Sequence, residues 1–261
     1  GESGILNVIH KDASGVSADF CEGYKVDTGL IKKDFINVGA NCILDNAKII
    51  VTNRSVTKIE EILPFMDYLH KLKVPLVIVA SGYTEEVIAT IVKNLPKMSV
   101  CPVLAPASGD MKNSFLEDIC ALTGATFLNG EEDMYFEDFI QKYKSLSGDD
   151  ASDYIEEFFG DADKITVSKD DMKIMSSTDI SNHIESLETI LKTSEDDMIN
   201  EFTKKRIALL KGSIVDIIFP ILTNAESSFN YDRYDDSFRA TLSALKYGVN
   251  VGGGKTYLNA Y

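Results

Sequence analysis

The sequence predicts an α/β fold built around a largely parallel sheet. Between residues 49 and 128, short apolar segments rich in β-branched residues alternate with amphipathic helical segments. The segment 75–80 is apolar throughout, which is typical of a strand that is buried on both faces. With 261 residues, the chain is long enough to bury one large core or two smaller ones.

The elements of the first half follow one another from residue 49. Thr57 and Glu60 have the spacing of a capping box, which predicts that a helix begins there. Thr84 can cap the next helix, and Glu85 and Glu86 lie in its first turn, where the helix dipole favours acids. The expected elements are a strand at 49–52, a helix at 57–72, a strand at 75–80, a helix at 84–95, a strand at 100–104, a helix at 108–122 and a strand at 125–128.

The second half of the chain is more polar. Residues 131–160 are acidic and rich in Ser, Gly and Asp, which indicates surface helices and loops. The expected elements after them are short strands at 164–168 and 173–176, a polar helical stretch at 179–211, a strand at 214–222 and a helix at 225–247.

The composition excludes several classes of partner. The formal net charge of −15 argues against nucleic acid and anionic membranes, because phosphate groups are bound by clustered Lys and Arg. The longest apolar runs are far shorter than the roughly 20 residues of a membrane-spanning helix. The four cysteines form no Cys-x-x-Cys pair and the three histidines lie far apart, so we expect no metal site. Reduced thiols and a cytoplasmic location are the expectation from this cysteine usage.

The chain begins without an initiator Met. Gly1-Glu2-Ser3 is the kind of remnant that a cleaved expression tag leaves. We therefore expect an excised segment of a longer protein.

Apolar residues surround more of the predicted helix at 58–72 than a single core-facing stripe requires. Ile62, Phe65 and Leu69 cannot easily share one side of this helix with Leu63 and Met66. Two interpretations remain open. The helix is buried on two sides, or it carries an exposed apolar strip that binds other proteins.

Gly252-Gly-Gly254 is followed by Lys255 and Thr256, which invites comparison with a phosphate-binding P-loop. The spacing does not fit, because the first glycine of that motif would have to be residue 249, which is Val249. A helix is also expected before the glycines, where a P-loop requires a strand. A tight turn after a helix explains the pattern, although three glycines would still let backbone N–H groups approach a phosphate.

Five parts of the sequence, taken in order, resemble group I (GroEL-type) chaperonins. They are Cys21-Glu-Gly-Tyr-Lys-Val-Asp-Thr-Gly29, Ile59-Glu-Glu-Ile-Leu-Pro64, Lys73-Val-Pro-Leu-Val-Ile-Val-Ala80, Leu104-Ala-Pro-Ala-Ser-Gly-Asp110 with the helix up to Gly124, and Asp236-Ser-Phe-Arg-Ala-Thr-Leu with the residues up to Gly254. Each is modest alone, but their order and spacing over most of the chain are specific.

The resemblance implies a division into domains. Residues 22–211 would form the apical, client-binding domain, with mixed sheets flanked by helices. Residues 1–21 and 212–250 would belong to the intermediate domain, and residues 251–261 would begin the equatorial domain. Gly23 and Gly212 fall at the two chain crossings where the family hinges, and glycine tolerates large changes in φ and ψ.

The resemblance also implies a groove that captures unfolded or misfolded proteins, the clients, by non-directional burial of apolar side chains. The positions that match this groove are Leu30, Phe35, Leu63, Met66, Ile88, Val92 and Asn94.

Three charged residues depart from the family pattern. Asp34 and Lys93 stand where the family usually has apolar side chains, and Lys32 stands where it has a small polar one. We expect these charges to reduce the apolar area of the client-binding groove. A GroES-like lid would bind in the same groove, so the charges also argue against a chaperonin that depends on such a lid. Such drift fits a divergent chaperonin, for example one encoded by a large bacteriophage.

In this family the full-length protein forms a homo-oligomeric ring that binds ATP and Mg²⁺ and hydrolyses ATP. Asp236 matches the catalytic aspartate of the intermediate-domain helix, and Gly253 matches a backbone contact to the nucleotide. The phosphate-binding Gly-Asp-Gly-Thr loop is absent from this sequence. We therefore expect that this chain alone binds no cofactor and does not hydrolyse ATP.

Two other functions remain open from the sequence. A stand-alone α/β nucleotide-binding enzyme using residues 248–256 would need a strand before the glycines. A peptide-binding adaptor that forms no ring would need a gene that ends near Tyr261.

Overall fold

The computed structural model describes residues 5–11, 15–21, 23–129, 136–212, 214–220 and 224–249, together with Val251 and Lys255. The chain divides into two compact units. The larger unit is Glu22–Gly212, and the smaller unit combines Gly1–Cys21 with Ser213–Tyr261. Each unit has a sheet of its own.

The larger unit is organised around β4, Cys42–Thr52, the central strand of a seven-stranded mixed sheet. The second half of β4 pairs in parallel with β6, Leu76–Ala80, and its first half pairs antiparallel with β10, Gly160–Val167. All five residues of β6 are buried, as their apolar run predicts. The strand order is β3-β11-β10-β4-β6-β8, with β9 also paired to β4. The remaining strands of this sheet are β3, Tyr24–Val26, β8, Val100–Leu104, β9, Phe127–Leu128, and β11, Met172–Met175.

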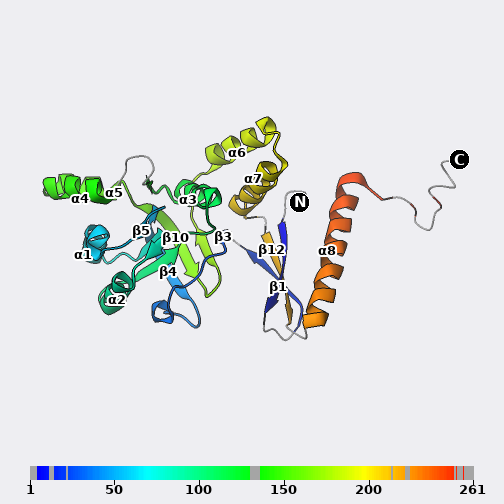
Figure 1. The fold of residues 1–261 in the computed structure, drawn as a ribbon, viewed down its shortest axis with the longest axis horizontal. Coiled ribbons are helices and arrows are strands. Elements are labelled where there is room, and N and C mark those ends of the chain that lie inside the picture. Colours follow the sequence, from blue (N-terminus) through cyan, green and yellow to red (C-terminus); the bar gives the residue numbers. More distant parts are fainter. Residues whose placement is uncertain are drawn as a thin grey trace. The chain divides into compact units, whose positions relative to one another are not determined.

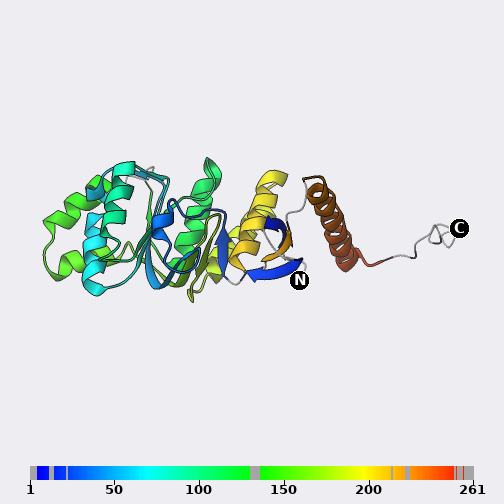
Figure 2. The same cartoon turned by 90° about the horizontal axis from the view of Figure 1, so that it is seen from below.

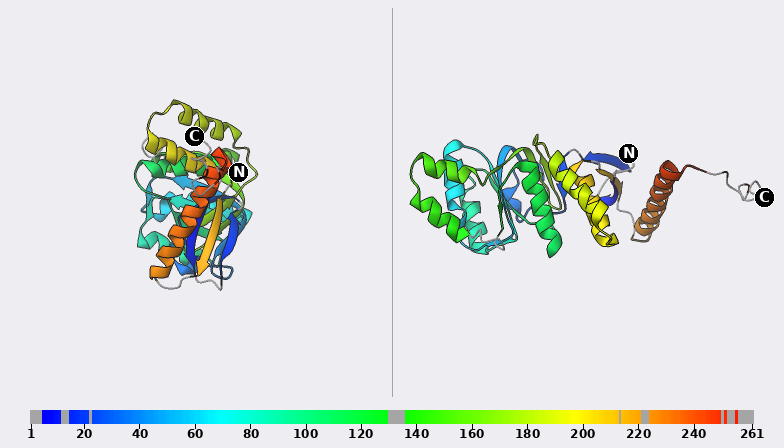
Figure 3. Two further views of the ribbon diagram at one scale, coloured as in Figure 1. Left: turned by 90° about the vertical axis from the view of Figure 1, so that its right-hand side faces the viewer. Right: turned by 90° about the horizontal axis from the view of Figure 1, so that it is seen from above.

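Helices cover both faces of this sheet. Figures 1 and 2 show α1, Leu63–Leu72, and α2, Glu85–Asn94, on one face and α3, Asp110–Thr123, on the other. The right-hand view of Figure 3 shows the same layers, with α6 and α7 beyond α3 and α4 and α5 beside α1. The bounds of these four are α4, Phe136–Ser145, α5, Asp149–Glu156, α6, Ser181–Thr193, and α7, Asp197–Leu210. The strand–helix alternation predicted between residues 49 and 128 is confirmed.

Short elements complete the larger unit. They are the 3₁₀ turns η1, Lys33–Phe35, and η2, Ile59–Glu61, and the small parallel pair of β5, Ser55–Val56, with β7, Gly82–Tyr83.

Two predicted helices differ from the structure. The helix expected from Thr57 is preceded by η2 and begins only at Leu63. Glu61 accepts hydrogen bonds from the backbone and the hydroxyl of Thr57, so Glu61 and not Glu60 closes this turn. The single helical stretch expected at 179–211 is two helices, because Asp196 accepts hydrogen bonds from the N–H groups of residues 198 and 199 and thereby starts α7.

The smaller unit contains a three-stranded sheet in the order β1-β12-β2. β12, Ile214–Pro220, runs parallel to β1, Ile5–Lys11, and antiparallel to β2, Ser17–Cys21. The long helix α8, Asn224–Tyr247, contacts β1. Residues 221 and 222, which were expected to continue β12, lie outside the described residues. None of the helices in the described part of the chain has the length and apolar character that a membrane span needs.

Candidate functional site

α1 carries the first part of the predicted groove. Pro64 lies in its first turn, where the missing N–H group would have no partner in any case. Phe65 and Leu69 are completely buried, whereas Leu63 at the start of the helix is 41% exposed. Met66 is only 4% exposed. The expectation that Met66 faces solvent is therefore wrong, because it lies on the inward side of the helix.

α2 carries the second part of the groove. The hydroxyl of Thr84 caps this helix by accepting a hydrogen bond from the N–H group of Val87 at 3.4 Å, as predicted. Ile88 is 3% exposed, so the expectation that it faces solvent is wrong: with Val87 it belongs to the stripe that packs against the sheet. Val92 and Asn94, at the end of the helix, are half-buried.

The segment that carries Leu30 and Phe35, two further positions that match the groove, is mostly packed into the unit. Phe35 is buried at the end of η1, and Leu30 is half-buried. The three charged departures from the family pattern, Lys32, Asp34 and Lys93, are all exposed. Next to Val92, therefore, the accessible surface includes the charged side chain of Lys93.

Aromatic side chains of α4 and of the segment that follows α5 cover a second side of α1. Phe65 stacks on Phe139 with ring centroids 4.6 Å apart, and it meets Phe158 and Phe159 edge-on at 6.3 and 5.5 Å. This packing buries the Phe65 side of α1, while Leu63 and Leu72 at the two ends of the helix remain exposed. α1 therefore combines a buried middle with exposed apolar side chains at both ends.

A sequence signal for this packing exists. Phe139 and Tyr143 are four residues apart on α4, and Tyr154 and Phe158 are four residues apart at α5 and its end. Residues at this spacing lie on one face of a helix, so each pair predicts an aromatic face that needs a partner. The acidic character of residues 131–160 conceals this signal, because it indicates solvent-exposed helices.

Asp118 on α3 is the centre of a buried polar cluster that no sequence motif predicts. Arg206 on α7 donates to both carboxylate oxygens, at 2.9 Å from Nε and 2.7 Å from Nη2. Nε2 of His183 on α6 lies 2.7 Å from the same carboxylate, and the hydroxyl of Tyr24 on β3 donates to it at 3.3 Å. Burial, and then the negative charge of Asp118, raises the pKa of Tyr24 well above its ordinary value. The cluster joins four elements of the larger unit.

The residues expected to act on nucleotide lie in the smaller unit. Asp236 is exposed on α8. α8 ends at Tyr247, so a helix and not a strand precedes the glycines, as expected. Gly253 lies outside the described residues. Within the described ranges, no three His, Cys, Asp or Glu side chains are close enough to hold a metal ion.

Gly23 and Gly212 have left-handed backbone conformations, with φ of 89° and 61°. Both lie within a residue of an end of the larger unit, Glu22–Gly212. A Cβ atom at Gly23 would lie 2.6 Å from the carbonyl oxygen of Ile174. Residue 23 therefore accepts only glycine without rearrangement.

Comparison with known proteins finds a similar chaperonin. No protein-family model matches the chain. The chain is 28% identical over 268 residues to the chaperonin GroEL of Aster yellows witches'-broom phytoplasma (strain AYWB). The match covers the whole chain and 47% of the relative, so the chain spans about half the length of the curated relative it matches. This likeness along the entire chain supports the resemblance to GroEL-type chaperonins that the sequence motifs carry.

Proposed function

We propose that residues 22–211 are the apical domain of an ATP-dependent ring chaperonin and that they capture non-native proteins through an apolar face on α1 and α2. The observation that carries this proposal is the 28% identity to a GroEL chaperonin along the whole chain. In Figures 1 and 2, α1 and α2 lie next to each other on one face of the sheet, which is compatible with a shared binding face.

Two side chains are the accessible centre of the proposed face. Leu63 is exposed at the start of α1, and Val92 is half-buried near the end of α2. Complete burial of such a side chain against a client stabilises the complex by roughly 1.5–3 kcal/mol, so a few of them suffice for reversible capture. Apolar burial is non-directional, and non-native chains expose more apolar surface than folded ones, so no sequence code is required.

Met66, Ile88 and Phe35 have a different role in this proposal. Because they are buried, these side chains anchor α1, α2 and η1 to the rest of the unit. They can contact a client only if these elements move. Leu30 and Asn94 are both half-buried and remain predicted client-binding positions, Leu30 in the segment beneath the face and Asn94 at its polar edge. The proposal therefore depends on Leu63 and Val92 more than on the other matched positions.

Lys93 follows Val92 directly and is exposed. A charge here disfavours the burial of a purely apolar client segment, because the ammonium group would lose water. We propose that this face is narrower and more polar than is usual in the family. A GroES-like lid that competes for the same face would meet the same charge.

The proposed intermediate domain comprises residues 1–21 and 212–250, with Gly23 and Gly212 as hinges. The division of the chain into compact units and the left-handed conformation of both glycines support this assignment. In the full-length ring, Asp236 would help activate the water that attacks ATP, and Gly253 would contact the nucleotide with Mg²⁺ present. We propose a cytoplasmic location and no ATP hydrolysis by this chain alone.

The experiment replaces the two accessible side chains by carboxylates. A Leu63→Glu, Val92→Glu double variant should lose most of its ability to suppress the aggregation of a chemically denatured enzyme, measured by light scattering. Met198→Glu is the matched control, because Met198 is an apolar side chain of α7 that is 73% exposed in the same unit. Undiminished suppression by the double variant, or an equal loss in the control, would refute the proposed face.

A further inference from the structure

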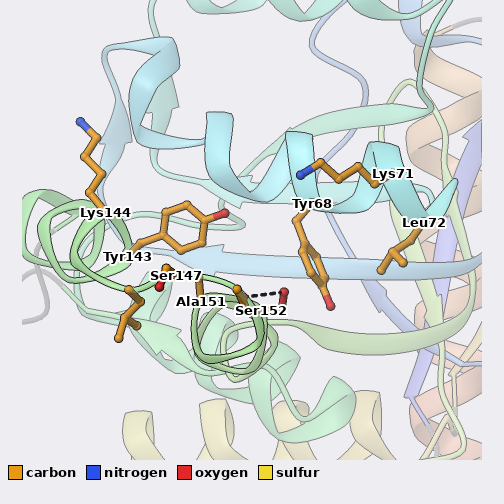
Figure 4. Close-up of a pocket in the computed structure, with 10 residues that line it drawn as sticks. Tyr68, Lys71, Leu72, Tyr143, Lys144, Ser147, Ala151 and Ser152 are labelled. Carbon is orange, nitrogen blue, oxygen red and sulfur yellow. Dashed lines mark hydrogen bonds between the residues drawn. The ribbon is translucent and has the colours of Figure 1, made fainter.

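A cavity of about 590 Å³ lies between α1 and the pair α4–α5. Its size is within the usual range of ligand sites. Its wall combines apolar side chains with lysines, hydroxyl groups and the start of α5. The lining residues are Tyr68, Lys71, Leu72, Tyr143, Lys144, Leu146, Ser147, Gly148, Ala151 and Ser152 (Figure 4).

The apolar part of the wall offers rings and an exposed leucine. Leu72, at the end of α1, is 54% exposed, and the ring of Tyr143 is held in place by stacking on Phe139 at 6.0 Å. The hydroxyl of Tyr68 donates a hydrogen bond to Glu156, and this bond raises the pKa of Tyr68 to about 12. Tyr68 therefore stays neutral and presents its ring to the cavity.

The charged part of the wall is positive. Lys71 and Lys144 are exposed, and neither forms an ion pair with any described residue. Figure 4 shows the ammonium group of Lys71 and the hydroxyl of Tyr143 directed toward one another from α1 and α4, while Lys144 extends outward. No carboxylate lines the cavity, although α5 begins with Asp149 and Asp150. In a chain with a net charge of −15, these two lysines give the wall of the cavity a local positive charge beside exposed apolar surface.

We infer that this cavity binds an extended peptide segment that carries an apolar or aromatic side chain next to a carboxylate. The side chain would pack against Leu72 and Tyr143, and the carboxylate would accept hydrogen bonds from Lys71 and from the hydroxyl of Tyr143. The inference rests on the proposed function, because the peptide would be part of a non-native client. The cavity would give the client-binding domain a second contact, which selects acidic segments. The proposed face on α1 and α2 is instead apolar and partly basic.

The test uses two short fluorescein-labelled peptides, one with alternating Phe and Glu and one with alternating Phe and Gln, and measures binding by fluorescence anisotropy. The Phe/Glu peptide should bind more tightly, and Lys71→Gln should weaken its binding about fivefold while leaving the Phe/Gln peptide unaffected. Leu72→Glu should weaken the binding of both peptides. Lys169→Gln, at an exposed lysine in the turn between β10 and β11, is the control and should change neither.

Three results would overturn the inference. The two peptides could bind equally, Lys71→Gln could leave the Phe/Glu affinity unchanged, or Leu63→Glu could abolish peptide binding, which would assign the peptide to the face on α1 and α2. Circular dichroism of each variant shows whether the fold is retained, and exposed positions such as Lys71 and Leu72 should tolerate substitution. If the Leu63→Glu, Val92→Glu variant suppressed aggregation as well as the wild type while the Phe/Glu peptide still bound, the proposed function would fail but this site would stand.

Discussion

Arg206 on α7 binds the fully buried carboxylate of Asp118 on α3 by donating two hydrogen bonds of 2.9 and 2.7 Å. The two residues are far apart in sequence, and α3 and α7 meet in this pair. A bidentate guanidinium–carboxylate contact fixes both the distance and the angle between the elements that carry it. The pair therefore holds the two-helix segment α6–α7 against the rest of the larger unit.

Removing one partner of this pair should strongly destabilise the folded protein. Asp118→Asn leaves the buried Arg206 charge with only the exposed carboxylate of Glu117, 3.9 Å away, as a counter-charge. We expect the free energy of unfolding to fall by about 3 kcal/mol. Urea denaturation followed by circular dichroism measures this change. The control is Asp161→Asn, which breaks the exposed Lys48–Asp161 pair and should cost less than about 1 kcal/mol. Equal effects of the two substitutions would contradict the structural role assigned to Asp118.

Alkaline pH should destabilise the protein partly through Cys120. Burial, and then the charge of Glu117, raises the pKa of the Cys120 thiol from its ordinary value of 9.0 to about 12. Between these values the unfolded chain has lost the thiol proton and the folded chain retains it, so folding takes up a proton and stability falls as pH rises. The slope from this one group reaches about 1.4 kcal/mol per pH unit.

Cys120→Ala should therefore flatten the decline of stability between pH 9 and 12, whatever its effect at neutral pH. Urea denaturation at a series of pH values gives the slope for both proteins. Part of the decline should persist, because burial also raises the pKa of Tyr83 well above its ordinary value. Parallel curves for the wild type and the variant would show that Cys120 does not contribute.

The aromatic packing between Phe65 and Phe139 should hold α4 and α5 against α1. Phe139→Ala removes a buried ring and should destabilise this region by about 3–5 kcal/mol. Hydrogen exchange followed by mass spectrometry should show faster exchange in residues 136–156 and in α1, with little change in α6 and α7. Tyr143→Phe, which keeps its ring, is the control. Unchanged protection of α1 in Phe139→Ala would mean that the aromatic contact does not stabilise that helix.

Gly23 should resist substitution far more than an unconstrained glycine. Gly23→Ala places a methyl group against the carbonyl of Ile174 in a left-handed conformation, and we expect a loss of about 1–2 kcal/mol or more in thermal or urea unfolding. Gly15→Ala is the matched control, because no heavy atom lies within 4 Å of the added Cβ atom. A comparable loss in both variants would contradict the conclusion that residue 23 accepts only glycine without rearrangement.

The parallel part of the sheet can be predicted from sequence because its strands are short apolar runs between amphipathic helices. β6 illustrates this, since its five residues leave no alternative to burial on both faces. The burial of Met66 could not be predicted from the pattern of α1 alone, because it depends on how α1 packs onto the rest of the unit. Phe65 on the same helix is covered by Phe139 and other aromatic residues of a distant, acidic segment.

The predicted client-binding residues also differ in how well the sequence predicts their accessibility. Leu63 and Val92 keep the accessibility that a binding role needs, whereas Ile88 and Phe35 do not. The matched positions identify which elements carry the site, but only packing decides which side chain on each helix turn faces water. The Asp118–Arg206 pair lies beyond sequence reasoning altogether, because an isolated acid on one helix does not indicate its partner on another.

The pairing of β4 with β10 also constrains how the larger unit acquires its structure. β6 and β8 lie close along the chain to the second half of β4, so these contacts close short loops and can form early. The antiparallel pairing of β4 with β10 forms only after residues 160–167 have been synthesised, because these residues follow all the intervening strands and helices in the sequence. During synthesis on the ribosome, the parallel half can therefore nucleate first, while the first half of β4 stays unpaired until the distant strand emerges.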